Sequence, residues 1–106
     1  MMTSHLTGWA PNAAELFISN ADSLQNTKWI HLGNPTRFDT TLNSQSTFVL
    51  PFPSTKQPGT VFYIYMRDRS DYPNLLNASY IWLPYTFHSD TNVSREWQDQ
   101  WNLSDY

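Results

Sequence analysis

The stretch Val61-Phe62-Tyr63-Ile64-Tyr65-Met66 decides the fold, because both of its alternating sets of side chains are apolar or aromatic. The stretch Tyr80-Ile81-Trp82-Leu83-Pro84-Tyr85 has the same pattern. A strand that is apolar on both faces has to be covered on both faces, whereas a lone β-sandwich of this length presents one polar, alternating face. A blade of a β-propeller meets the requirement, since each blade packs between two neighbours. A small antiparallel barrel or sandwich is the alternative.

Short apolar runs separated by Pro, Gly, Asn, Asp and Ser clusters continue along the whole chain, and none has a sustained helical period. They predict an all-β protein with strands over Met1–Trp9, Glu15–Ser19, Trp29–Leu32, Ser46–Leu50, Thr60–Arg67, Ser79–Phe87 and Arg95–Leu103. The first three strands form one group and the last four another, and four-stranded units that recur at about 40 to 60 residues are typical of propeller blades. Because two blades cannot close a ring, we expect a fragment of a larger domain.

The composition excludes several classes of function. The chain has 106 residues, of which 14% are charged and 16% aromatic, and its net charge is -3. This charge leaves no basic footprint for nucleic acid, and no apolar run approaches the roughly 18 residues of a membrane span. The lack of cysteine rules out disulfides, thiol catalysis and thiolate metal sites.

Two features bear on where the protein acts. Residues 1–5 have neither a basic region nor an apolar region of a secretory signal. Three glycosylation sequons nevertheless begin at Asn77, Asn92 and Asn102. Together they favour an extracellular parent protein whose signal peptide is not on this chain.

Few residues fall into a catalytic pattern. The acidic residues lie mostly in turns or at strand ends, and no pair predicts a two-carboxylate hydrolase site. His5, His31 and His88 lack the spacing of metal ligands, so we expect no metal and no cofactor. Asn43 and Gln45 lead directly into a predicted strand. They could face a ligand in a central channel or cap the turn, and the capping interpretation is the simpler one.

Four segments in the same order resemble glycoside hydrolase family 43, and more narrowly its galactan 1,3-β-galactosidase group. They are Ser4–Asn12, Asn43–Pro51, Tyr65–Arg69 and Ala78–Pro84. The resemblance implies the C-terminal part, about two blades, of a five-bladed β-propeller. Residues 1–36 would be a partial penultimate blade and residues 37–106 the last blade. The general acid glutamate of such enzymes would belong to earlier blades.

The resemblance also implies site residues. The galactanase group positions the attacking water with a glutamine on the last blade, and Gln45 matches that position. A neutral amide is a poor proton acceptor, so Gln45 is expected to orient water rather than act as a conventional base. Thr7 and Trp9 match a motif beside the terminal galactose, with a capped turn and a core tryptophan as the alternative. The sequence departs from the family's Gly-Asp-Arg-Trp pattern, because Arg67 precedes Asp68 and Ser70 follows Arg69. We expect Asp68 and Arg69 to form a structural ion pair.

The function that these features imply is that of a glycoside hydrolase fragment similar to inverting exo-β-1,3-galactanases. Its partner would be a polysaccharide, β-1,3-galactan of the arabinogalactan type, with no nucleic acid and no membrane involved. Because the general acid is not on this chain, we expect the isolated chain to be inactive. A non-catalytic carbohydrate-binding β-module is the alternative, and a mistaken gene product that never folds is a third hypothesis.

Overall fold

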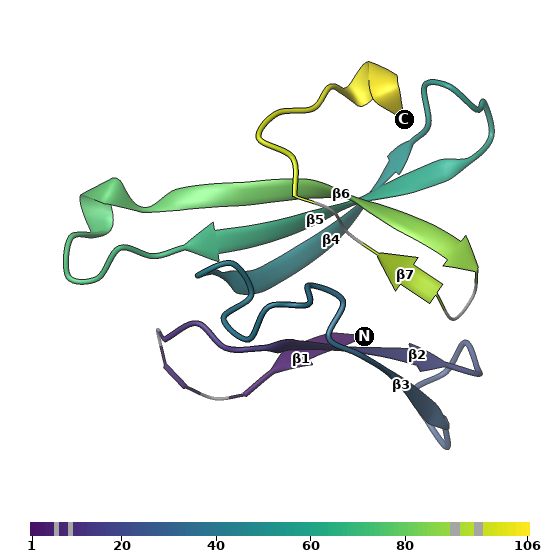
Figure 1. Ribbon diagram of the computed structural model, residues 1–106. Helices are drawn as coiled ribbons and strands as arrows, with labels where there is room; N and C mark the ends of the chain where they lie inside the picture. Colours follow the sequence, from purple (N-terminus) through teal and green to yellow (C-terminus); the bar gives the residue numbers. More distant parts are fainter. Residues whose placement is uncertain (6, 9, 90–91, 95–96) are drawn as a thin grey trace.

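The protein is built from two antiparallel sheets, one above the other in Figure 1. The computed structural model describes residues 1–5, 7–8, 10–89, 92–94 and 97–106. No α-helix occurs within those ranges, which contain two short 3₁₀ turns: η1 (Leu75–Asn77) between β5 and β6, and η2 (Leu103–Asp105) after the strands. No helix in the described ranges is long and apolar enough to cross a membrane. The predicted all-β class is therefore confirmed.

The first sheet has three strands in the order β1 (Met2–Ser4), β2 (Ala14–Ser19) and β3 (Trp29–Gly33). All neighbours are antiparallel, with Thr3 opposite Glu15 and Ile18 opposite Ile30. The second sheet has four strands in the order β4 (Gln45–Pro53), β5 (Val61–Arg69), β6 (Ser79–Ser89) and β7 (Asn92–Ser94). The predicted first group of three strands is confirmed, and the second sheet also has four strands, but its last strand is β7 and not the predicted Arg95–Leu103.

The seventh predicted strand, Arg95–Leu103, is wrong. Arg95 and Glu96 lie outside the described residues; the last strand that the structure describes is β7, and residues 97–102 form an irregular segment that ends in η2. This segment is held by rings rather than by a strand ladder: Trp101 and Tyr106 pack on Phe62 of β5, with ring centroids 6.4 Å and 5.2 Å away. The aromatic residues of this segment therefore reflect ring packing against β5 rather than a β-strand.

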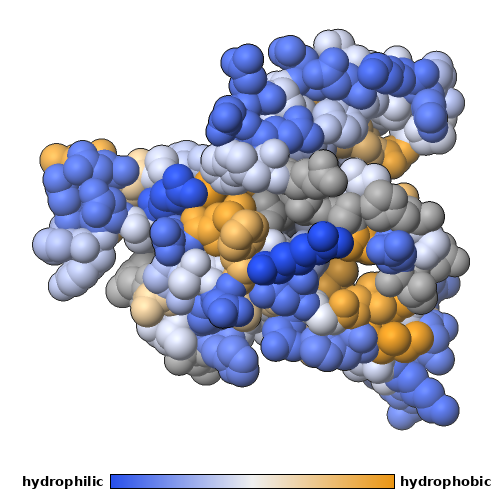
Figure 2. Space-filling model, viewed as in Figure 1, coloured by the Kyte–Doolittle hydropathy of each residue, from blue (hydrophilic) through white to orange (hydrophobic). Residues whose placement is uncertain are grey.

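The two apolar faces of β5 and β6 are covered unequally. On one face Tyr65 and Leu83 lie directly opposite each other and are fully buried, because the first sheet lies against this side. On the other face Phe48 and Trp82 flank Met66 across three strands and are 57% and 52% exposed. The segment 97–106 lies above part of the sheet in Figure 1, and Figure 2 shows apolar surface between hydrophilic areas. The chain thus covers one face well and the other only partly.

Candidate functional site

Gln45 joins the two sheets. It is the first residue of β4 and is half-buried. Its Nε2 donates a hydrogen bond of 2.6 Å to the carbonyl oxygen of Gly8, which lies in the loop between β1 and β2. The structure therefore brings together two of the segments that carry the family resemblance, although they lie 37 residues apart in the chain.

The loop that receives Gln45 is shaped by one side chain. Asn12 accepts a bond of 3.2 Å from the backbone N–H of His5 and donates a bond of 2.7 Å to the carbonyl of the same residue. Its Nδ2 also donates to Thr7 Oγ1, which in turn donates to the carbonyl of Ala10 at 2.5 Å. The Thr7 side chain is exposed and its hydroxyl caps the turn. Trp9, the other predicted sugar-binding residue, lies outside the described residues.

A left-handed turn immediately precedes Gln45. Thr41, Leu42 and Asn43 have φ angles of 51°, 60° and 54°, although none of them is glycine. Asparagine adopts this region readily, whereas Thr41 and Leu42 each cost roughly 1–2 kcal/mol, and a β-branched residue such as Thr41 is a clear outlier here. Strain of this kind persists only where the surroundings enforce it, and it is often found next to functional residues.

The buried hydroxyl of Thr41 enforces the turn from one side. Its Oγ1 donates to the carbonyl of Asn12 and accepts a bond of 2.9 Å from the backbone N–H of Ala14. Ser44, also buried, donates from Oγ to the carbonyl of Thr41 at 2.7 Å. The turn before Gln45 is thereby fastened to the start of β2, in the other sheet.

Two arginines of β5 hold the turn from the other side. Arg67 is fully buried and its Nη2 donates to the carbonyl of Thr41. Arg69 Nη2 donates to the carbonyl of Leu42 at 2.9 Å. The predicted ion pair between Asp68 and Arg69 is wrong, because successive residues of a strand point to opposite faces. Carbonyl oxygens exposed by the unusual backbone of the turn are the partners of both guanidinium groups.

The chemistry available to Gln45 follows from this support. Its Nε2 is engaged with Gly8, and no hydrogen bond of the described residues occupies its Oε1. An amide oxygen accepts hydrogen bonds but does not take a proton at neutral pH. The Gln45 Oε1 is therefore a hydrogen-bond acceptor whose direction is set by the bond from Nε2 to Gly8.

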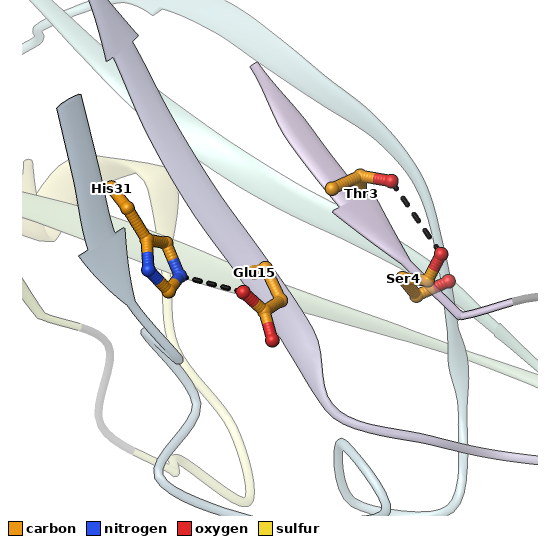
Figure 3. Close-up of polar contacts among 4 residues, drawn as sticks. All are labelled: Thr3, Ser4, Glu15 and His31. Atoms are coloured by element: carbon orange, nitrogen blue, oxygen red, sulfur yellow. Dashed lines mark hydrogen bonds and ion pairs between the residues drawn. The ribbon is translucent and has the colours of Figure 1, made fainter. Parts of the chain in front are cut away.

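The ion pair that the described residues form lies elsewhere, on the first sheet. His31 Nε2 and Glu15 Oε2 are 2.6 Å apart on β3 and β2, as Figure 3 shows together with the Thr3 hydroxyl bonded to the Ser4 carbonyl. The His31 ring stacks on Phe17 with centroids 4.7 Å apart. The two side chains are 50% and 32% exposed, so the pair contributes little to stability. The described residues contain no group of three His, Cys, Asp or Glu that could hold a metal ion.

An aromatic pocket was not predicted from the sequence. A cavity of about 300 Å³ lies between the start of β6 and the irregular segment before η2. The frequent tryptophans in the last quarter of the chain could have indicated this pocket, but the pattern there predicted a strand instead. The lining residues are Arg69, Tyr80, Ile81, Trp82, Leu83, Trp97, Gln98, Asp99, Gln100 and Trp101.

Two solved structures match the chain over nearly its whole length. A GH43 β-1,3-galactosidase solved with galactodeoxynojirimycin has 36% sequence identity and a TM-score of 0.77, over 96% of this chain and 28% of that chain. The exo-β-1,3-galactanase 1,3Gal43A from Clostridium thermocellum has 32% identity and a TM-score of 0.69, over 91% of this chain and 20% of that chain. No protein-family model and no curated protein matches the sequence.

Proposed function

Since these matches confirm the resemblance to glycoside hydrolase family 43, we propose that the chain is a C-terminal piece of the catalytic domain of a galactan-cleaving hydrolase. The chain spans 28% and 20% of the length of the two matching proteins, both of which are named as enzymes acting on β-1,3-galactosides or β-1,3-galactan. In this proposal residues 1–36 belong to the penultimate blade of a five-bladed propeller and residues 37–106 form the last blade. The antiparallel sheets of three and four strands support that division.

The bond between Gln45 and Gly8 is the observation that carries the proposed mechanism. Inverting hydrolysis needs an acid on the leaving oxygen and a group that holds water on the opposite face of the sugar. Gln45 holds that water through Oε1, while the bond from Nε2 to Gly8 keeps the amide plane from rotating. The general acid belongs to blades outside this sequence, so the isolated chain binds but does not cleave.

The loop that accepts the Gln45 bond supplies the proposed sugar contacts. The Thr7 hydroxyl is exposed one residue before Gly8 and can bond a sugar hydroxyl while it caps its turn. Trp9 follows one residue later and offers an indole for stacking on the pyranose. The polysaccharide partner in this proposal is β-1,3-galactan of the arabinogalactan type, with no cofactor.

An extracellular parent protein remains part of the proposal. The sequon residues Asn77, Asn92 and Asn102 are all exposed, so N-linked glycans attached to them would not disturb the core. Expression in a glycosylating eukaryotic host should add glycans, which mass spectrometry before and after glycosidase treatment detects. Failure to modify any of the three sites would remove this support.

A chimaera tests the catalytic proposal. Residues 1–106 replace the matching segment of the GH43 β-1,3-galactosidase, and proton NMR follows the anomer released from β-1,3-galactan. We expect hydrolysis with inversion, and Gln45→Ala should lower kcat by about 10²–10⁴-fold, the range for loss of a group that assists proton transfer. Binding of galactodeoxynojirimycin checks that each chimaera is folded.

Gln57→Ala is the matched control, because Gln57 is exposed in the turn between β4 and β5 and its described hydrogen bonds use only backbone atoms. The control should retain full turnover. A Gln45→Ala chimaera with near-normal kcat and normal inhibitor binding would contradict the proposed role.

A further inference from the structure

The position of the Gly8 carbonyl decides how firmly the Gln45 side chain is held. Gly8 has a φ angle of 63° and lies in a turn that is closed by a hydrogen bond of 3.2 Å from the backbone N–H of Ala10 to the carbonyl of Thr7. The Gly8 carbonyl oxygen accepts the bond of 2.6 Å from Gln45 Nε2. Because a hydrogen bond fixes a side chain only as well as its partner is itself fixed, the Gln45 amide depends on the groups that hold this turn.

The Asn12 side chain holds the turn around Gly8. Its Oδ1 accepts from the backbone N–H of His5 at 3.2 Å, and its Nδ2 donates to the carbonyl of His5 at 2.7 Å and to Thr7 Oγ1. These bonds use both the oxygen and the nitrogen of the amide, so its partners determine its orientation. Thr7 Oγ1 in turn donates to the carbonyl of Ala10 at 2.5 Å. Both residues that close the turn are therefore tied to one half-buried side chain.

The backbone of Asn12 is held by the turn that leads into Gln45. Its carbonyl oxygen accepts from the buried Thr41 Oγ1, which also accepts a bond of 2.9 Å from the backbone N–H of Ala14. The two partners of the bond between Gln45 and Gly8 are thus connected a second time, through Asn12 and Thr41. This closed set of hydrogen bonds keeps the donor and the acceptor in register, and bonds in such a network support one another.

We propose that Asn12 is a positioning residue of the hydrolytic site. It places the Gly8 carbonyl, the carbonyl sets the plane of the Gln45 amide, and Gln45 Oε1 directs the attacking water. Asn12 acts through Gln45 and not on the sugar. This role rests on the proposed function, because the plane of the amide matters only if Gln45 holds the water. A misplacement of about 1 Å can lower a rate by about 10²-fold, which sets the size of the expected effect.

Asn12→Asp in the chimaera tests this role. Aspartate has the size of asparagine and can accept from the His5 N–H, but its carboxylate has no donor for the His5 carbonyl or for Thr7 Oγ1. We expect kcat on β-1,3-galactan to fall by about 10–10²-fold. Combined with Gln45→Ala, the substitution should lower kcat no further than Gln45→Ala does alone, because residues that act through one another are not additive. A merely structural role would lower kcat in both backgrounds.

Asn26→Asp is the matched control and should retain full turnover, because Asn26 is exposed in the turn between β2 and β3 and its side chain makes none of the described hydrogen bonds. Binding of galactodeoxynojirimycin checks that each chimaera is folded. If Asn12→Asp does not fold, Asn12→Ala takes its place, since it removes the same bonds without adding a charge. The proposal is overturned if the Asn12 variant keeps near-normal kcat where Gln45→Ala loses it, or if the two losses multiply. Near-normal kcat of Gln45→Ala itself would contradict the proposed function, and this role with it.

Discussion

At the scale of single residues, Thr41 connects the strained turn to the first sheet. The backbone there is left-handed, and the hydroxyl bonds the carbonyl of Asn12 and the N–H of Ala14. Neither the φ angle nor these partners could be read from the sequence, because threonine rarely adopts this conformation and the partners lie 29 and 27 residues away. The same limit explains why the predicted ion pair between Asp68 and Arg69 is wrong. A sequence shows opposite charges, but it does not show that the turn leaves the carbonyl of Leu42 free to accept from Arg69.

Thr41→Val tests this connection, because it keeps the shape of the side chain and removes the hydroxyl. Two backbone groups then lose their partner in a buried site, and we expect the free energy of unfolding to fall by about 1–3 kcal/mol. Urea unfolding followed by tryptophan fluorescence measures the change. Thr40→Val is the matched control, since Thr40 is exposed and its described hydrogen bond uses its backbone carbonyl. Equal stabilities of the two variants would show that the Thr41 hydroxyl does not hold the turn.

At the scale of elements, prolines mark where the second sheet stops pairing. β4 is an edge strand, and it carries Pro51 and Pro53 at alternate positions. Proline has no N–H to donate, so it fits an antiparallel ladder only where that side of the strand is unpaired. Pro84 on β6 obeys the same rule, because β7 pairs only with residues from Thr86 onward. These prolines restrict edge-to-edge pairing between molecules.

The double substitution Pro51→Thr and Pro53→Thr restores two donors on the open edge of β4. We expect it to promote association of the chain through that edge, seen by light scattering coupled to size-exclusion chromatography. Pro58→Ala, in the turn before β5, is the control and should leave the molecular mass unchanged. A double variant that remains as monomeric as the control would contradict the role given to these prolines.

Most elements were predictable, for a physical reason that also explains the exception. Five of the seven predicted strands have apolar residues at strand spacing bounded by Pro, Gly or Asn and were found within a few residues of their predictions, whereas β1 (Met2–Ser4) covers only the start of the predicted Met1–Trp9. The segment after β7 has equally aromatic residues, but Trp101 and Tyr106 bury their rings on Phe62 without a ladder. The aromatic composition therefore indicated that this segment packs in the protein, but it did not indicate its backbone conformation. In the candidate site, the family resemblance pointed to Gln45, but the sequence could not show its bond to Gly8.

At the scale of the whole molecule, the chain exposes more surface than its mass requires. Its accessible area is 7661 Å², whereas a compact monomer of 12.4 kDa exposes about 6,100 Å². Its radius of gyration is 15.0 Å, compared with about 13 Å for a compact domain of this length. An apolar cavity of about 420 Å³ remains open between the sheets, lined in part by Met2, Phe17 and Tyr85. These quantities agree with a piece that is completed by further sheets.

We therefore expect the isolated chain to self-associate as its concentration rises, through the exposed row that contains Phe48 and Trp82. Phe48→Ser should reduce this association. It should also change the free energy of unfolding by only about 0.5 kcal/mol, because the side chain is already 57% exposed. Analytical ultracentrifugation and urea unfolding measure the two effects. A wild-type chain that stays monomeric at high concentration would contradict this expectation.

The hydrogen bond between Gln45 and Gly8 can also report how the two sheets are aligned. Its donor belongs to one sheet and its acceptor to the loop of the other, so any sliding or tilting of the sheets changes this bond before it changes the strands themselves. The two side-chain amide protons of Gln45 should give separate NMR signals whose positions and exchange with water report the alignment. The same residue that is proposed to hold water would thus record, in a spectrum, whether the two layers are assembled correctly.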